Sequence, residues 1–257
     1  MQVASSSVAK PAAGPAPSPR APAWLEPVRR YGEYVLGAGA AVGILVTLWL
    51  ALVYAPTDAL QGDVQRIEYV HVPMAWVAYL AFFIVFVASV VYLWRGGERW
   101  DLLGRASAEV GTVFTTLVLI TGSLWGKPVW GTWWQWDARL TTTLILWFIY
   151  VGYLLLRAYT GRSDGGARAA AVLGIVGFVD VPINYLSVTW WRTLHPSLQV
   201  PLGQQPQAPA SVVTTLMISM LSFTLLFTFV LLQVYRLQKA QGEALRLRAR
   251  VEIDRME

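Results

Sequence analysis

The chain has 257 residues, of which 56% are hydrophobic and only 14% charged, whereas soluble domains usually carry about 25% charged residues. The deficit indicates a membrane protein. A net charge of +5 does not indicate nucleic-acid binding, because the basic residues flank apolar runs instead of forming one patch. The absence of cysteine excludes thiol–disulfide exchange and thiolate metal sites. The chain has two histidines, so any imidazole chemistry must use one or both of His71 and His195.

The first segment, residues 1–27, contains six prolines, many Ala and Ser, and almost no large apolar side chains. It cannot bury a core, so we expect residues 1–30 to form a disordered cytoplasmic tail. Residues 31–235 then form a membrane domain with six apolar stretches, each near the roughly 20 residues that a helix needs to cross a bilayer. The stretches are residues 34–54, 70–94, 106–124, 140–159, 167–188 and 212–235.

Two features modify this plan of an all-α polytopic membrane protein. Pro182 is expected to kink the fifth stretch, which membrane helices tolerate. Residues 236–257 are rich in Glu and Arg and are expected to extend the sixth helix as a charged, solvated, cytoplasmic tail.

The distribution of basic residues predicts the orientation. Sixteen of the twenty Lys and Arg lie in the two tails and in the second and fourth loops; the other three loops hold only Arg66, Lys127, Arg139 and Arg192. By the positive-inside rule both termini are cytoplasmic. His71, which begins the second helix, the loop between the third and fourth helices, and His195 in the third outer loop are then all expected on the outer face.

That second outer loop, residues 125–139, places five tryptophans in twelve residues. Its glycines and proline make a poor helix interior, since Gly costs about 1 and Pro about 3 kcal/mol there, so we expect an irregular, aromatic-walled surface. Tryptophans also form interfacial belts, but a belt needs only one or two per helix end, and the clustering favours a binding platform. The tryptophans are Trp125, Trp130, Trp133, Trp134 and Trp136, with Trp190 and Trp191 as a pair in the next outer loop.

The polar residues of this face have structural and functional interpretations. Asp137 is placed to cap the fourth helix, and Arg139 either extends to the interface or pairs with an anionic ligand group. Histidine is a common axial ligand of haem iron, and a porphyrin is a flat apolar body that tryptophans can cover. Haem is therefore a reasonable ligand, with its propionates near Lys127, Arg139 and Arg192.

Asp180 and Asn184 lie within the fifth apolar stretch, where ionisable groups are costly and are candidates for function. A hydrogen bond between helices is the interpretation we favour for them. They remain second-tier candidates for a ligand path.

The segment WGKPVWGTWWQWDARLT (residues 125–141) resembles the signature of the haem-handling WWD-domain proteins, and YVHVP (69–73) and WWRTLH (190–195) resemble their two histidine-bearing segments. With six spans in about 250 residues, the chain is similar to the cytochrome c maturation protein C (CcmC, haem exporter protein C) family within that group. The resemblance covers about residues 30–235.

The resemblance implies a non-enzymatic role in cytochrome c biogenesis in the bacterial inner membrane. Haem b would be a transient cargo on the periplasmic face, with His71 and His195 as iron ligands, for delivery to the haem chaperone CcmE. The implied complex contains CcmA, CcmB and the small subunit CcmD, within membrane lipid. Two alternatives stay open: a permease that moves haem or another solute, and a membrane oxidoreductase with b-type haem.

Overall fold

The computed structural model describes residues 25–195 and 208–256. Within them, six helical segments are long and apolar enough to cross a membrane, which confirms the all-α, six-span prediction. The elements are α1 (Leu25–Trp49), a π-helical turn η1 (Leu50–Tyr54), a 3-10 helix η2 (Asp63–Ile67), α2 (Glu68–Arg95), α3 (Glu98–Trp130), α4 (Ala138–Thr160), α5 (Asp164–Phe178), α6 (Asp180–Trp190) and α7 (Ala210–Asp254).

Several helices are longer than the apolar stretches from which they were predicted. Helix α1 begins at Leu25. Residues 25–30 are therefore helical, whereas the sequence predicted them to be disordered. Residues 1–24 lie outside the described residues. Helix α7 has 45 residues and is therefore about 68 Å long at 1.5 Å per residue, against a hydrocarbon core of about 30 Å. Its length confirms that the charged tail continues the sixth helix.

The fifth span is broken, as Pro182 predicted. Helix α5 ends at Phe178 and α6 starts at Asp180. Phe178 lies four residues before Pro182, so its carbonyl is the one that the pyrrolidine ring displaces and leaves without a helical N–H partner. The backbone N–H of Val179 turns back to the carbonyls of Gly177 and Val176, and the span continues in a second helix.

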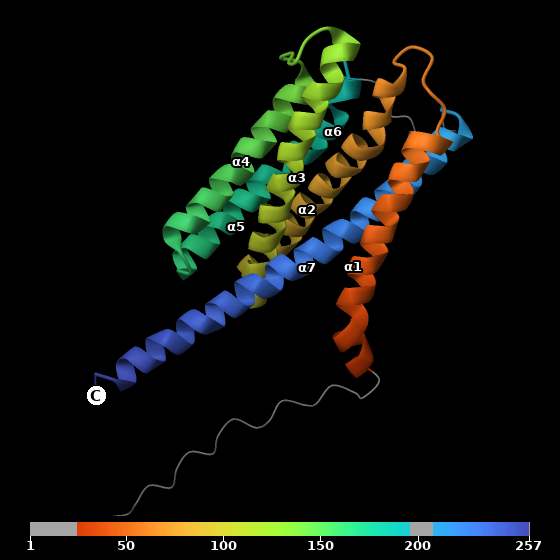
Figure 1. Cartoon of the computed structure of the whole chain (residues 1–257). Helices are drawn as coiled ribbons and strands as arrows, with labels where there is room; N and C mark the ends of the chain where they lie inside the picture. Colours follow the sequence, from red (N-terminus) through yellow and green to blue (C-terminus); the bar gives the residue numbers. More distant parts are fainter. Residues whose placement is uncertain (1–24, 196–207, 257) are drawn as a thin grey trace, which may run out of the picture.

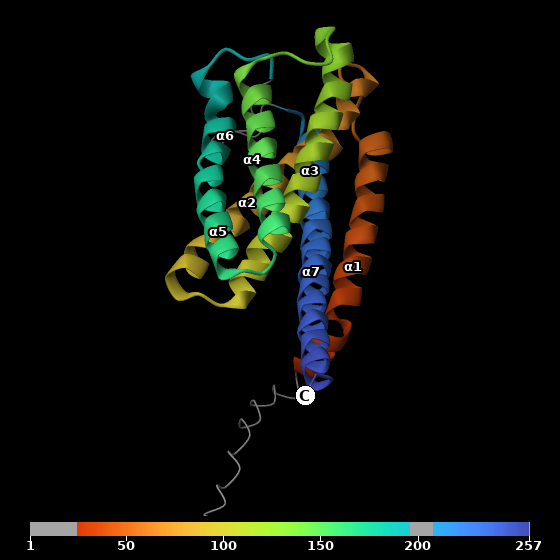
Figure 2. The same cartoon turned by 90° about the vertical axis from the view of Figure 1, so that its left-hand side faces the viewer.

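The helices α2 to α6 form a bundle (Figures 1 and 2), and α7 crosses it obliquely in the view of Figure 1. Helix α1 lies along α7. We call the end of the bundle that carries residues 131–137 the tryptophan end, at the top of Figure 1; it also carries the η1–η2 segment and the end of α6. The opposite end, near the C-terminus, is called the tail end.

Close backbone approach lets the bundle pack around aromatic rings. Phe82 of α2 and Tyr150 of α4 stack with ring centroids 3.7 Å apart and planes 11° apart. A Cβ added to Gly111 of α3 would lie 2.8 Å from the ring of Phe82. Small residues at such contacts are typical of membrane helices, whose association depends on close packing more than on the hydrophobic effect.

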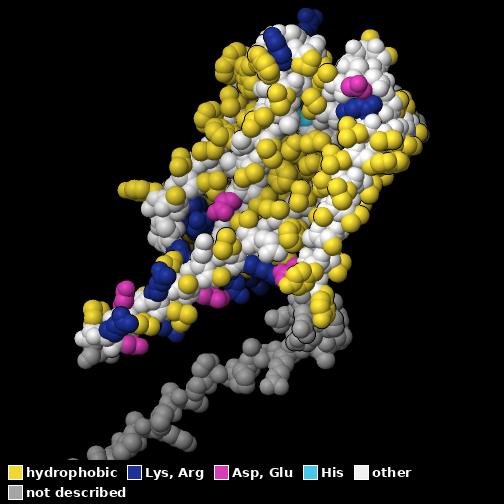
Figure 3. Space-filling model, in the orientation of Figure 1, with side chains coloured by type: hydrophobic (Ala, Val, Ile, Leu, Met, Phe, Trp, Pro, Cys, Tyr) yellow, Lys and Arg dark blue, Asp and Glu magenta, His cyan; other side chains and the backbone are white. Residues whose placement is uncertain are grey.

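The outer surface of the helices is apolar. Large hydrophobic side chains such as Val35, Leu45, Val113 and Leu155 are exposed, and yellow side chains spread over the middle of the face in Figure 3. In water an apolar surface of this extent would be a binding or aggregation site. It suits a chain surrounded by lipid.

Ion pairs tie the tail end together. Arg157 of α4 is almost fully buried and pairs with Asp101 of α3 at 2.6 Å. Glu98 receives both Arg162, at 2.8 Å, and Arg246 of α7, at 2.7 Å. Through these ion pairs α7 is anchored to the start of α3 and to the α4–α5 connection at the tail end.

Candidate functional site

The tryptophan segment is helical in its first part, which corrects the expectation of an irregular loop from residue 125 onward. Helix α3 continues through Pro128 to Trp130 and ends at Gly131, whose φ of 78° is left-handed and whose N–H bonds to Lys127 O at 3.0 Å. Pro128 lies in the last turn, so it removes a single helical hydrogen bond. Gly126 lets the indole of Trp130 pack against the helix, since a Cβ there would lie 3.0 Å from that ring.

A cavity opens at this end between α2, α3 and α4. It contains about 1250 Å³ of space, part of it open to solvent. Its walls come from segments far apart in the sequence, including residues before α2 and the segment after α6. Of the predicted site residues, six line it: His71, Trp125, Trp130, Trp134, Arg139 and His195.

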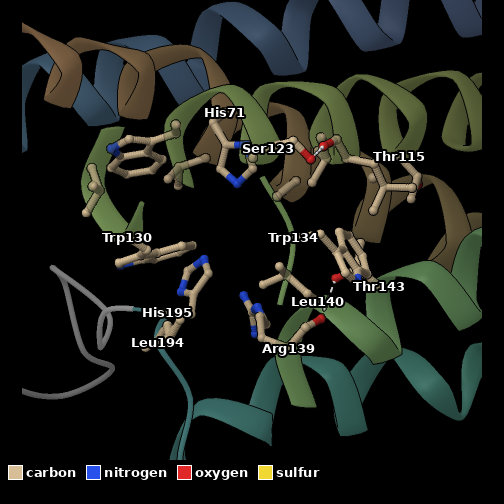
Figure 4. A pocket seen from close by; sticks show the side chains of 18 of the residues that line it. His71, Thr115, Ser123, Trp130, Trp134, Arg139, Leu140, Thr143, Leu194 and His195 are labelled. Carbon is tan, nitrogen blue, oxygen red and sulfur yellow. Dashed lines mark hydrogen bonds between the residues drawn. The ribbon is translucent and has the colours of Figure 1, made fainter. Parts of the chain in front are cut away.

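His71 projects into this cavity from the first turn of α2 (Figure 4) and is only 8% exposed. Its Nδ1 lies 2.8 Å from Thr121 Oγ1, and the Thr121 hydroxyl also lies 2.8 Å from the carbonyl of Leu117. A hydroxyl has one hydrogen; when it donates to that carbonyl, its oxygen accepts the Nδ1–H of His71. The lone pair of His71 then resides on Nε2, the form in which neutral imidazole binds a metal.

His195 approaches from the opposite side. It follows the end of α6, is half-buried, and directs its ring into the same space as His71, next to Trp130 (Figure 4). Its backbone N–H donates to Thr193 Oγ1 at 3.1 Å. The two histidines therefore face one cavity, although 124 positions separate them.

Of the seven tryptophans predicted for the site, three line the cavity and four lie outside it. Trp125 Nε1 donates to Gln61 Oε1 at 2.8 Å, and its ring meets the His71 ring edge-on at 5.7 Å between centroids. Trp134 contacts Trp136 edge-on at 5.6 Å. Trp133 lines a separate shallow groove between α3 and α4, and the remaining three are more than half exposed: Trp136, Trp190 and Trp191.

Of the three expected cations, only Arg139 lines the cavity. Its Nη1 donates to the carbonyls of Asn184 at 2.6 Å and Tyr185 at 3.1 Å, which holds the guanidinium against α6. Lys127 is exposed and donates to Gly131 O at 3.0 Å, at the end of α3. Arg192 is exposed on the segment after α6.

Asp137 caps α4, as predicted, by accepting the N–H of Leu140 at 2.8 Å. Its other oxygen accepts the hydroxyl of Thr193 and, at 3.1 Å, the N–H of Leu194. The same carboxylate thus joins the tryptophan segment to the segment that carries His195. The sequence motif alone indicated only the cap.

Asn184 makes the interhelical hydrogen bonds that we favoured. The two hydrogens of its Nδ2 are shared among three acceptors, Arg139 O at 3.1 Å, Thr142 Oγ1 at 2.7 Å and Thr143 Oγ1 at 2.9 Å, and its Oδ1 accepts from Tyr79. This network joins α2, α4 and α6 beneath the cavity.

Asp180 differs from Asn184. Its Oδ2 is buried and accepts no hydrogen bond from the residues that the structure describes.

Gln61, Tyr79, Thr121 and Gly122 also belong to the site, and sequence reasoning missed them. A Cβ on Gly122 would lie 3.1 Å from Cε1 of His71, so this glycine gives the imidazole its space. Gln, Tyr, Thr and Gly are common residue types and carry no signature of their own. Only their position in the cavity wall or beside His71 shows their role.

Fold and site define a class: polytopic helical membrane proteins with two histidines facing an aromatic cavity at one end of the bundle. The sequence profile described as CcmC, Heme exporter protein C, matches residues 20–250. The chain belongs to this family.

Individual relatives agree with this assignment. The heme exporter protein C of Bradyrhizobium diazoefficiens is 38% identical over 216 residues, covering 84% of this chain and 80% of the relative. That of Escherichia coli is 44% identical over 159 residues, covering 61% and 64%. A ccmC-like mitochondrial protein of Marchantia polymorpha, named for cytochrome c biosynthesis, is 37% identical over 195 residues, covering 75% and 77%.

Proposed function

We propose that this chain binds haem as a transient cargo in its cavity and hands it on during cytochrome c biogenesis. The observation that carries the proposal is the placement of His71 and His195 on opposite sides of one aromatic-walled cavity. The family names of its relatives point to the same ligand.

The ligand set suits haem iron better than a bare metal ion. The described residues contain no group of three or more His, Cys, Asp or Glu that would hold an ion. Haem iron receives four nitrogens from its porphyrin and needs only one or two protein ligands. His71, with its lone pair on Nε2, supplies one, and His195 supplies the other.

The rest of the cavity suits the macrocycle. Trp125, Trp130 and Trp134 provide flat apolar faces for the porphyrin. Arg139 keeps Nε and Nη2 for a propionate, because its hydrogen bonds to the carbonyls of Asn184 and Tyr185 use Nη1. Lys127 and Arg192 lie outside the cavity lining and would meet a propionate only at its rim.

We infer that the tryptophan end faces the periplasm and that the chain lies in the bacterial inner membrane with both termini in the cytoplasm. The distribution of Lys and Arg supports this orientation. A site open at the membrane surface suits delivery to a partner, for which we propose the haem chaperone CcmE. CcmA, CcmB and CcmD are the further partners in this proposal, which treats the chain as a carrier and not an enzyme.

The proposal is tested with purified protein in nanodiscs. Haem titration of the unaltered chain should give the absorption of six-coordinate, bis-histidine iron. His71→Ala and His195→Ala should each give five-coordinate iron, and the double variant should lose specific binding. A double variant with an unchanged spectrum would refute the ligand assignment.

Orientation has its own test. The chain contains no cysteine, so single cysteines at Thr132 and Gly161 report on opposite ends without background. A membrane-impermeant maleimide applied to intact spheroplasts should label position 132 and spare position 161. The reverse pattern would overturn the orientation.

A further inference from the structure

One carboxylate at the tryptophan end serves two elements. Asp137 Oδ1 accepts the N–H of Leu140 at 2.8 Å and caps α4. Asp137 Oδ2 accepts the hydroxyl of Thr193 and the N–H of Leu194, the latter at 3.1 Å. We call the second set of contacts, from Asp137 to Thr193 and Leu194, the latch.

The latch reaches the backbone of His195. Thr193 Oγ1 donates its hydrogen to Asp137 and accepts the N–H of His195 at 3.1 Å. Asp137 thereby holds Thr193 and Leu194 directly and His195 through the hydroxyl of Thr193. Leu194 and His195 both line the cavity, so the part of the loop that the latch holds is the part that faces the ligand.

Capping alone does not account for an aspartate at this position. An N-cap needs one side-chain oxygen, and serine supplies it about as well as aspartate. The second oxygen of Asp137 is not used by α4 and is directed to another loop. Its partners lie 56 and 57 positions away, so this contact contributes to the tertiary arrangement and not to the local helix.

We propose that Asp137 is a positioning residue that, through Thr193, fixes His195 over the cavity and keeps this iron ligand in register with the tryptophan segment. The inference rests on the proposed haem function. A ligand on an unlatched segment would have to order that backbone each time it bound iron, and ordering of residues opposes binding. Partners that orient a metal ligand typically contribute about 10- to 100-fold in metal affinity.

Three variants separate the latch from the cap. Asp137→Ser retains a capping oxygen and removes the second one. Thr193→Ala removes the hydroxyl and leaves the cap intact, whereas Thr193→Ser retains the hydroxyl as a rescue. Thr189→Ala is the matched control: its exposed hydroxyl donates only to Leu186 O, one turn before the end of α6, among the bonds that the structure shows.

The first measurement needs no haem. Amide hydrogen exchange in the haem-free protein should be at least about tenfold faster at Leu194 and His195 in Asp137→Ser and Thr193→Ala. Thr193→Ser and Thr189→Ala should exchange like the unaltered chain. Unchanged exchange in both latch variants overturns the proposal whatever haem does.

The second measurement uses haem. Both latch variants should convert part of the iron from six- to five-coordinate and bind haem about 10- to 100-fold more weakly, and Thr193→Ser should restore both properties. Faster exchange with unaltered coordination and affinity overturns the positioning role. An unaltered chain that binds no haem refutes the proposed function, and the exchange data then still show whether the latch holds the loop.

Discussion

Replacement of Thr121 by valine tests the tautomer of His71. Valine has nearly the shape of threonine but lacks the oxygen that lies 2.8 Å from Nδ1 of His71. His71 is almost fully buried, so no bulk water replaces the lost acceptor. Either Nδ1–H stays unpaired, or the proton moves to Nε2 and blocks the nitrogen that would bind iron.

The cost follows from the burial. An unsatisfied buried donor costs about 1–3 kcal/mol, which corresponds to a haem affinity about 5- to 150-fold lower. In the haem-free protein the proton can move to Nε2, whereas bound iron would force it back to the unpaired Nδ1. The cost therefore falls mainly on haem binding, and the unfolding temperature should change less than the haem affinity. The reduction potential of bound haem should rise, since a partner at Nδ1 increases the basicity of the iron ligand.

The assay is a haem titration with a redox titration of the bound form in nanodiscs. Thr121→Ser should behave like the unaltered chain. Thr112→Val is the matched control, because the hydroxyl of Thr112 bonds within α3 to Ala108 O and Thr112 does not line the cavity. An affinity and a potential of Thr121→Val equal to those of the unaltered chain would show that Thr121 does not fix the tautomer of His71.

Three further predictions concern packing and charge. Trp130→Ala should weaken haem binding about tenfold or more because Trp130 lines the cavity, whereas Trp136→Ala, at a side chain 74% exposed, should change it less than threefold; equal losses would contradict this division. Asn184→Ala removes three donor contacts and should lower the free energy of unfolding by about 2–4 kcal/mol, measured by thermal unfolding in detergent. An unchanged unfolding curve would show that this network does not stabilise the fold. Asp101→Asn leaves the guanidinium of Arg157 buried without its carboxylate and should cost about 3–5 kcal/mol, most of which Asp101→Glu should recover if charge and not shape matters.

The spans were predictable because the rule behind them is local. A backbone in hydrocarbon must satisfy its own hydrogen bonds, so about 20 apolar residues imply a helix. Pro182 marked a break for an equally local reason, the clash with the carbonyl four residues before it. The same rules were wrong for residues 125–130. Helix α3 runs through Gly126, on which the Trp130 indole packs, and through Pro128, which lies in the last turn and removes a single helical hydrogen bond.

The candidate site was predictable in part. Two histidines and a cluster of tryptophans in an otherwise apolar chain are few enough to stand out, and the Lys and Arg distribution assigned them to one side. Their sorting was not predictable: Trp134 lines the cavity while Trp133, its neighbour in the chain, lies in another groove. Adjacent residues can face different surfaces once a helix ends, and no sequence period then applies.

The sequence by itself determined six helical spans and the set of aromatic and imidazole groups at one end, since both follow from composition and short-range spacing. Only the tertiary structure decided which groups meet. Thr121 comes to His71 across 50 positions, and Asp137 comes to Thr193 across 56. Such contacts depend on how helices pack and where loops end, and the side chains that make them have no local pattern that distinguishes them from any other threonine or capping aspartate.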